Sequence, residues 1–200
     1  MKKTISLLLS ALLLFALAGC SSAPADDENT PPVPQAPVSA VITVKDYGTI
    51  KVSLDPDTAP LTVANFVDLA RNGFYDGLTF HRIISGFMIQ GGDPKGNGTG
   101  GSDRNVTGEF QENGVENNIS HTRGVISMAR ARDYNSGSSQ FFIVHLDSPY
   151  LDGQYAAFGC VTSGMDVVDA ICENTQVEDQ NGSVLPENQP IIESIVIKEG

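Results

Sequence analysis

The stretch Phe80-His-Arg-Ile-Ile-Ser-Gly-Phe-Met-Ile-Gln-Gly-Gly92 places one guanidinium and one amide among large apolar side chains, with glycines between two strand-like segments. Strand alternation predicts two sets of side chains that each share a face: Phe80, Arg82 and Ile84 in the first segment, Met88 and Gln90 in the second. Charged groups are seldom buried without a partner. We therefore interpret the two segments as the wall of an apolar cleft that holds one fixed donor.

The N-terminus has the pattern of an export signal. Lys2 and Lys3 precede an apolar run, residues 7–18, that is shorter than a membrane-spanning helix needs. The run ends in Leu17-Ala18-Gly19-Cys20, which resembles the bacterial lipobox, where the cysteine is lipidated and becomes the new N-terminus; the alternative is an ordinary signal followed by a chance cysteine. We predict a lipoprotein signal peptide at residues 1–19, and a chain anchored outside the cytoplasm to a bacterial membrane through lipidated Cys20.

Residues 20–39 form the predicted tether between this anchor and the domain. They are rich in Ser, Ala, Asp and Pro, a composition that cannot build a core and that favours an extended polyproline II spacer. The formal net charge is −12, and it becomes −14 when Lys2 and Lys3 are removed with the signal. Such an acidic chain is not expected to bind nucleic acid.

Residues 40–200 are enough for one domain with a sizeable core and too few for two ordinary domains. Cys160 and Cys172 are the cysteines of this domain, and in an exported chain a disulfide between them is allowed but not required. The sequence leaves their redox state open.

The domain has alternating apolar segments typical of strands and two segments with helical spacing. The first helix has Pro60 in its first turn and Gly73 at the position of a C-terminal cap, and the second spans residues 164–173. The predicted strands are Ala40–Lys45, Thr49–Leu54, Leu78–Ile84, Phe87–Gln90, Gly124–Ala129, Gln140–Val144, Ala156–Val161 and Ile191–Lys198.

Many short strands with two helices predict a mainly β domain, either a closed antiparallel barrel or a sandwich. Residues 93–122 form a long connection rich in Gly, Asn, Asp and Ser, which is compatible with the wall of a cleft. A phosphate-binding loop is the competing interpretation. It is disfavoured because the segment has no Gly-Lys-Ser/Thr ending and does not lead from a strand into a helix.

The sequence gives little support for hydrolase chemistry or for a metal site. The histidines are far apart and lack metal-ligand spacing. The two adjacent serines lie outside a nucleophile elbow, and we interpret two aspartates as turn residues. These residues are His81, His121, His145, Ser138, Ser139, Asp147 and Asp152.

Three later segments complete a recognisable set. They are Ser-Met-Ala-Arg (residues 127–130), Ser-Ser-Gln-Phe-Phe-Ile (138–143) and Tyr-Leu-Asp-Gly-Gln-Tyr-Ala-Ala-Phe-Gly (150–159). Together with residues 80–101 they resemble the cyclophilin family of peptidyl-prolyl isomerases, in the family's order, over about residues 41–198. The resemblance implies an eight-stranded antiparallel barrel, closed, with a helix over each open end.

The resemblance also implies rotation about the peptide bond before proline. Twisting this amide places the lone pair on the proline nitrogen, so a donor aimed at that nitrogen binds the twisted state more strongly than the planar states. Arg82 is the expected donor, because its guanidinium stays charged and needs no proton transfer. No bond is made or broken, so neither a cofactor nor a metal is expected.

By the same resemblance, Gln90 orients Arg82 or the substrate carbonyl, and Phe87, Met88, Phe142 and Leu151 hold the proline ring. The alternative for Phe142 and Leu151 is the barrel core. The remaining expected substrate contacts are Ala129 and Arg130 through their backbone, Gln140 along the groove, and Tyr150 and Tyr155 at the pocket edge.

Three positions depart from the best-known eukaryotic members. Tyr155 stands where they have histidine, Tyr150 where they have tryptophan, and Arg130 where they have asparagine, and the loop 132–138 is one residue longer. Tyr155 still offers an aromatic face and a hydroxyl, so we expect activity to survive. The family's tryptophan is tied to cyclosporin binding, so its replacement argues against high affinity for that drug.

Two functions are therefore compared. The first is a lipid-anchored isomerase that acts on X-Pro bonds of extracytoplasmic polypeptides and assists their folding, as a monomer. The second is a binding module that holds proline-containing segments without turnover. The presence of both Arg82 and Gln90 favours the isomerase.

Overall fold

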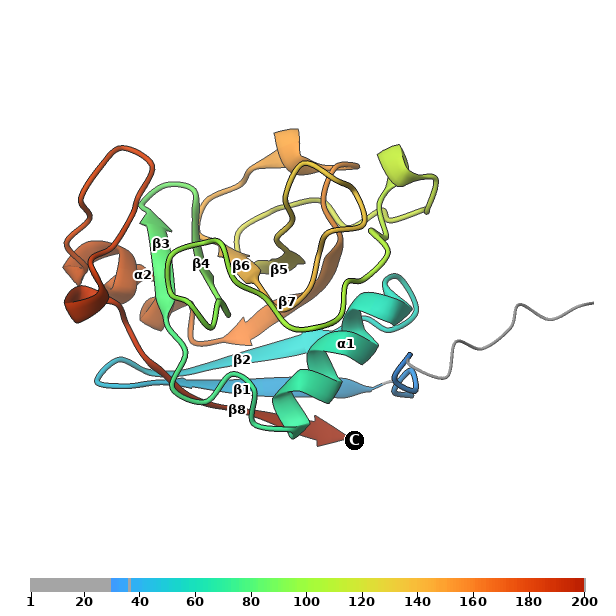
Figure 1. The fold of residues 1–200 in the computed structure, drawn as a ribbon, viewed down its shortest axis with the longest axis horizontal. Coiled ribbons are helices and arrows are strands. Elements are labelled where there is room, and N and C mark those ends of the chain that lie inside the picture. The colour runs from blue at the N-terminus through green and yellow to red at the C-terminus, as the bar shows by residue number, and fades with distance from the viewer. Residues whose placement is uncertain (1–29, 36, 200) are drawn as a thin grey trace, which may run out of the picture.

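The computed structural model describes residues 30–35 and 37–199. The predicted signal peptide, Cys20 and the first half of the tether lie outside the described residues. Within the described part of the chain, no helix is long and apolar enough to cross a membrane. The domain is one curled antiparallel sheet of eight strands with two α-helices (Figure 1), which confirms the predicted fold class.

Each strand lies within two residues of its predicted bounds. The sheet order is β3-β4-β6-β5-β7-β2-β1-β8. The strands are β1 (Val38–Val44), β2 (Gly48–Leu54), β3 (Phe80–Ile84), β4 (Met88–Gly91), β5 (Val125–Met128), β6 (Phe141–Val144), β7 (Ala157–Ser163) and β8 (Ile192–Glu199).

The predicted closure of the barrel is only partial. The edge strands β3 and β8 meet at a single bridge, Thr79 opposite Ile191, just before both strands begin. Further along β3, the free edge is occupied by another segment: the Ile83 amide donates to the Gly182 carbonyl at 2.8 Å, and the Val184 amide donates to the His81 carbonyl at 3.1 Å. These groups of β3 are therefore paired with residues 182–184, so β8 cannot use them to close the sheet.

The inner face of the sheet carries the main core. The alternate residues Val38, Ala40, Ile42 and Val44 of β1 are buried, as the period of two predicts. Large aromatic rings fill the centre, and the Tyr75 hydroxyl is satisfied there by donating to the Ser139 carbonyl at 3.1 Å. The rings in contact are Phe66, Tyr75, Phe80, Phe141 and Phe158.

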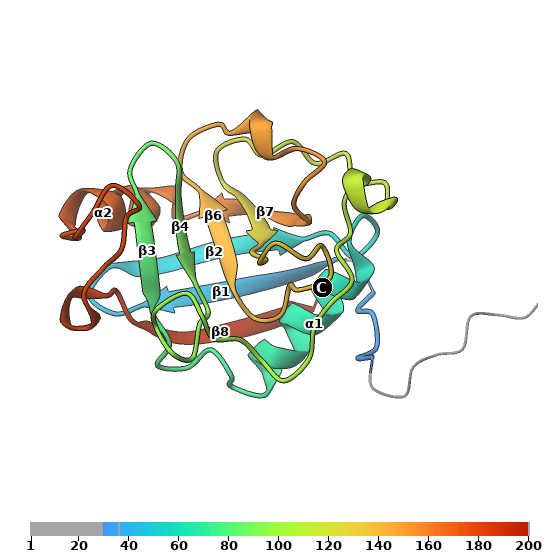
Figure 2. The same ribbon diagram turned by 45° about the horizontal axis from the view of Figure 1, so that its top comes forward.

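The two helices lie at opposite ends of the curled sheet (Figure 2). Helix α1 (Pro60–Arg71) is followed by Gly73 at φ +68°, a left-handed conformation that glycine adopts without strain. Helix α2 (Met165–Asn174) buries Val167, Val168, Ile171 and Cys172. Both helices thus contribute an apolar face to the same core cluster.

The cysteines of the domain are both free. Cys160 is exposed on β7, and Cys172 is buried on α2.

At the N-terminal side, β1 begins at Val38, two residues before the predicted domain start, and Pro34 is buried. The last part of the proline-rich segment therefore contacts the domain.

The first amides of α1 are capped by a residue from far along the chain. The N-cap position, Ala59, makes no side-chain hydrogen bond to the helix. Instead the buried Glu109 carboxylate accepts the amides of Leu61 at 2.9 Å and Thr62 at 2.8 Å, together with the Thr62 hydroxyl at 2.6 Å. This carboxylate satisfies donors that a helix start otherwise leaves unpaired, and it ties the long connection 93–122 to α1.

We expect Glu109→Ala to lower the free energy of unfolding by about 1–3 kcal/mol, because three donors lose their acceptor in a buried place. Urea denaturation measures the change. The exposed Glu116, whose side chain accepts from the Asn118 amide, is the control. Its replacement by Ala should change stability by less than about 0.5 kcal/mol. Equal losses for both variants would contradict the capping role.

Candidate active site

A β-bulge in β3 decides which side chains face the site. Phe80 pairs with Gly91 and Arg82 pairs with Gln90, so the register shifts by one residue between them. Phe80 consequently points into the main core, whereas Arg82 lies on the outer face beside Gln90. The prediction that Phe80 and Arg82 share a face was wrong, because simple alternation does not hold across a bulge.

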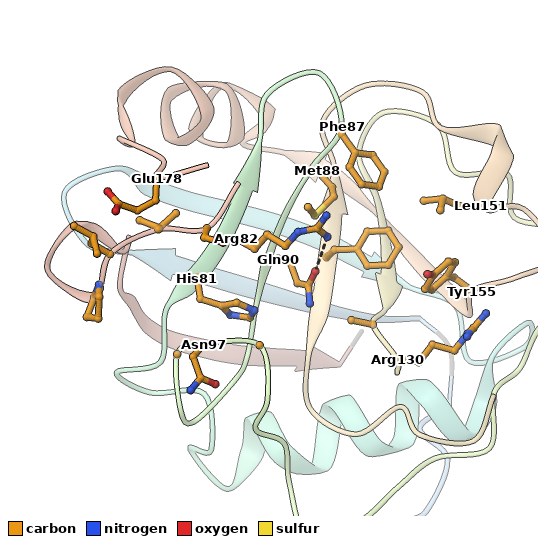
Figure 3. Close-up of a pocket in the computed structure, with 18 residues that line it drawn as sticks. His81, Arg82, Phe87, Met88, Gln90, Asn97, Arg130, Leu151, Tyr155 and Glu178 are labelled. Atoms are coloured by element: carbon orange, nitrogen blue, oxygen red, sulfur yellow. Dashed lines mark hydrogen bonds between the residues drawn. The ribbon is translucent and has the colours of Figure 1, made fainter. Parts of the chain in front are cut away.

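The outer face of the sheet carries a cavity of about 520 Å³ beside Arg82 (Figure 3). Its lining residues come from β3, β4 and β6, from connections at residues 87, 96–98, 129–130 and 151–155, and from the segment 178–186. The side chains expected at the site that line it are Arg82, Phe87, Met88, Gln90, Ala129, Arg130, Phe142, Leu151 and Tyr155.

The apolar wall of this cavity is a second hydrophobic cluster, separate from the barrel core. Met88 and Phe142 lie in it with Leu151, while Phe87 and Tyr155 pack against it half-buried. The rings of Phe142 and Tyr155 meet edge to face with centroids 5.8 Å apart. Phe142 and Leu151 thus belong to the pocket wall and not to the barrel core.

The Arg82 guanidinium is held at two of its nitrogens. Its Nε donates to the Asn181 carbonyl at 2.8 Å, and Nη1 donates to Gln90 Oε1 at 3.2 Å. The Gln90 amide then donates to Gln140 Oε1 at 2.9 Å, and the Gln140 amide donates to the Gly100 carbonyl at 2.7 Å. The remaining guanidinium N–H groups have no partner within the described ranges, and the side chain lines the cavity.

A second, more polar cavity of about 390 Å³ adjoins the first and shares Gln90, Ala129 and Arg130 with it. Gln140 and residues 98–102 of the glycine-rich connection line this second cavity. The buried Asp93 carboxylate organises that connection by accepting the amides of Lys95, Asn97 and Gly98 at 2.6–3.1 Å. These hydrogen bonds lower the pKa of Asp93 against the opposing effect of burial, which is the larger single influence.

Arg130 is held by neighbours within its own region of the domain. Its Nε and Nη2 donate to the Gln154 carbonyl at 3.0 and 2.9 Å. The guanidinium carbon lies 4.7 Å from the Tyr155 ring centroid and 4.8 Å from that of Tyr134, within cation–π range. The side chain therefore supports Tyr155 and links it to the longer loop 132–138.

Comparison with known proteins gives one consistent result. Residues 39–198 match the family described as "Cyclophilin type peptidyl-prolyl cis-trans isomerase/CLD". The chain belongs to this family. The cyclophilin prediction is confirmed, and with it the activity of a peptidyl-prolyl cis-trans isomerase.

Individual relatives agree with this assignment. Peptidyl-prolyl cis-trans isomerase B of Bacillus subtilis is 49% identical over 123 residues, covering 62% of this chain and 82% of the relative. A probable peptidyl-prolyl cis-trans isomerase of Brucella suis is 40% identical, covering 87% and 85%. A Cryptosporidium parvum cyclophilin, crystallised in the presence of the dipeptide Ala-Pro, has a TM-score of 0.70 and 33% identity, covering 81% of this chain and 99% of that one.

One residue expected at the cyclophilin site lies beside the cavity. Tyr150 is 62% exposed, and its ring centroid lies 5.8 Å from that of Phe87, which lines the cavity. Tyr150 thus supports a wall residue from outside.

Sequence reasoning missed several lining residues. His81 was set aside with the other histidines, yet it is buried at the cavity and its ring nitrogens have no hydrogen-bond partner in the described part of the chain. The segment 178–186, some of whose residues line the cavity, belongs to no predicted strand or helix. Its sequence has no periodicity or motif, so only its contact with β3 could have revealed it.

His121 forms a hydrogen-bonded chain below the apolar wall. Its Nδ1 lies 2.8 Å from Asp152 Oδ1 and its Nε2 lies 3.0 Å from Ser127 Oγ. This order of groups resembles that of a serine hydrolase, but Ser127 is fully buried and cannot reach a substrate. The His121 ring stacks on Phe142 with centroids 6.0 Å apart, so these hydrogen-bonded residues support the pocket wall.

Among the described residues, no cluster of His, Cys, Asp and Glu side chains could hold a metal ion.

Stability should fall between pH 7 and pH 5. Burial lowers the pKa of His81 and His121 below the ordinary 6.5, although Asp93 and Asp152 oppose this. Below pH 6.5 the unfolded chain therefore binds protons that the folded chain does not, and the free energy of unfolding decreases. The carboxyls with a lowered pKa change the free energy of unfolding only below about pH 4.

Urea denaturation at pH 7, 6 and 5 measures this slope. We expect the variant that combines His81→Gln with His121→Gln to have a lower stability at pH 7 but a smaller decrease toward pH 5. A slope equal to that of the natural chain would assign the acid sensitivity to other groups.

Proposed function

We propose that this isomerase acts on X-Pro bonds of polypeptides outside the cytoplasm, and that Arg82 donates a hydrogen bond to the nitrogen of the twisted amide. The orientation of the guanidinium carries this proposal: Asn181 and Gln90 accept from two of its nitrogens, and the side chain lines the apolar cavity. A barrier of about 18–20 kcal/mol separates the planar states because the nitrogen lone pair is delocalised. A donor to that nitrogen is effective only when the lone pair is localised by twisting.

The apolar wall suits the ring that must be held while the bond rotates. Phe87, Met88, Phe142 and Leu151 offer a surface on which a proline ring can be desolvated. The same surroundings disfavour the more polar planar amide relative to the twisted one. A wall that fixes the ring while the preceding carbonyl can rotate confines the motion of the substrate to the torsion of the X-Pro bond.

The client chain on the other side of the bond is proposed to extend toward the second cavity. Ala129 and Arg130 line both cavities, and Gln140 lines the second one. Gln90 connects the two parts, since its amide is bonded to Gln140 while its oxygen accepts from Arg82. Tyr150 in place of the family's tryptophan remains the reason to expect weak cyclosporin binding.

Arg82→Ala should lower kcat/KM by about a hundredfold or more, the usual effect of removing one transition-state donor. Arg82→Lys should lose most of the activity as well, because an ammonium group cannot reproduce the fixed fork of donors. A protease-coupled assay on a short X-Pro peptide measures the rate.

Arg123→Ala is the matched control, since Arg123 is exposed and pairs with Asp169 away from the cavity. It should retain the activity of the natural chain. An unchanged rate for Arg82→Ala would show that the donor is misassigned. A natural chain that binds the peptide but catalyses no isomerisation would instead favour the binding-module function.

Assistance to folding follows from the rate of the uncatalysed step. Isomerisation of X-Pro bonds takes tens to hundreds of seconds at 25 °C and can limit folding. A domain tethered by an acylated Cys20 would meet newly exported polypeptides at the membrane surface. The lipobox-like Leu17-Ala18-Gly19-Cys20 and the proline-rich segment that follows support this location.

Cys20→Ala should move the protein from the membrane fraction to the soluble fraction when the full chain is expressed in a bacterium and the membranes are washed with salt. The acyl chains contribute roughly 0.8 kcal/mol per buried CH₂, and this contribution is lost without the cysteine. Cys160→Ala, which replaces an exposed free cysteine of the domain, should leave the fractionation unchanged. Retention of the Cys20→Ala protein on washed membranes would argue against the lipid anchor.

A further inference from the structure

The acceptor that orients the Nε of Arg82 is a main-chain carbonyl in a surface turn. Asn181 supplies it at 2.8 Å. Because the guanidinium is planar, the direction of the Nε–H bond restricts the plane in which all its other donors lie. The turn that positions the Asn181 carbonyl therefore influences where the free N–H groups of Arg82 point.

One side chain organises this turn. Asp179 Oδ1 accepts the amides of Asn181 at 2.9 Å and Ser183 at 3.1 Å, and Oδ2 accepts the Ser183 hydroxyl at 3.1 Å. The Glu178 amide closes the turn by donating to the Ser183 carbonyl at 2.7 Å. Asp179 therefore accepts hydrogen bonds from the two residues that flank Gly182. The pKa of Asp179 is lowered, chiefly by the Ser183 amide, so the side chain is the charged acceptor at neutral pH.

The turn is also docked on β3 next to Arg82. Ile83, the residue after Arg82, donates its amide to the Gly182 carbonyl, and the carbonyl of His81, the residue before it, accepts from Val184. Gly182 has φ +77°, and a Cβ there would collide with the Ile83 carbonyl oxygen. The main chain of residues 181–184 thus has little freedom relative to the strand that carries Arg82.

We propose that Asp179 is a positioning residue for catalysis: it holds the Asn181 carbonyl at Arg82 Nε and so keeps the guanidinium aimed at the twisted amide. This inference rests on the proposed role of Arg82. Asp179 itself is exposed and is not among the residues that line the cavity, so it acts through Asn181. Asp179 therefore affects the stability of the transition state and not the binding of substrate, because the nitrogen of the planar amide does not accept a hydrogen bond from Arg82.

Kinetics of the full chain test the proposal. Asp179→Ala should lower kcat about ten- to a hundredfold, the range expected when a catalytic group is displaced by up to 1 Å. KM should stay within about twofold, because an interaction made only in the transition state changes kcat and kcat/KM equally. Asp179→Asn keeps an oxygen that can accept both amides, and it should restore most of the activity. An increase in KM with unchanged kcat would overturn the proposal.

Asp55→Ala is the matched control. Like Asp179, Asp55 caps a turn with both carboxylate oxygens, although it accepts one amide and not two: the amide and the hydroxyl of Thr58 donate to it at 2.9 and 2.8 Å. It lies outside the residues that line the two cavities. This variant should lose a turn cap of the same kind without losing activity. If Asp55→Ala lowered kcat as much as Asp179→Ala, a general loss of stability would account for both, and the proposal would be overturned.

A double-mutant cycle separates this inference from the proposed role of Arg82. In an Arg82→Ala background, Asp179→Ala should cause no further loss, because both changes remove the same donor. The NMR signal of Arg82 Nε–H should exchange with solvent faster in Asp179→Ala than in the natural chain. If Arg82→Ala abolishes activity while Asp179→Ala has no effect, only this inference fails. If Arg82→Ala is harmless, the proposed donor itself fails.

Discussion

The hydrogen bonds that hold the Arg82 guanidinium connect parts of the domain that are far apart in the sequence. Asn181 approaches from the segment that occupies the free edge of β3, and Gln90 approaches from the neighbouring strand. Through Gln140, the same chain of hydrogen bonds reaches the carbonyl of Gly100 in the glycine-rich connection. A planar cation with donors in fixed directions needs acceptors in fixed places. The sheet and the edge segment provide them, and the connection holds Gln140 behind Gln90.

The domain divides its apolar side chains between two clusters with different roles. The inner cluster fills the barrel with aromatic rings and with one face of each helix, and it accounts for the burial of most large side chains. The outer cluster, around Met88 and Phe142, leaves a cavity open to a substrate. Because isomerisation makes no covalent bond, the proposed mechanism needs only such a surface next to one oriented donor.

The identity of the family and most of the site followed from short motifs, because Arg82, Gln90, Phe142 and Leu151 lie within segments of characteristic sequence. Strand positions were also predicted closely, since alternation of apolar residues is a local property. The errors have a common physical origin. The bulge that turns Phe80 inward exists only in the pairing of β3 with β4, and the incomplete closure depends on residues 182–184 taking the edge of β3.

The amino-acid sequence by itself determined the family, the reaction, and the number of strands and helices, and it marked Arg82 as the candidate donor. These features depend on residue types and on spacing within single segments. Only the tertiary structure decided that Glu109 caps a helix 47 residues away, that Arg130 supports Tyr155, and that the turn of Asp179 is bonded to Arg82. Each of these contacts joins segments whose separation carries no periodic or motif signal, and long-range packing of the folded chain alone brings them together.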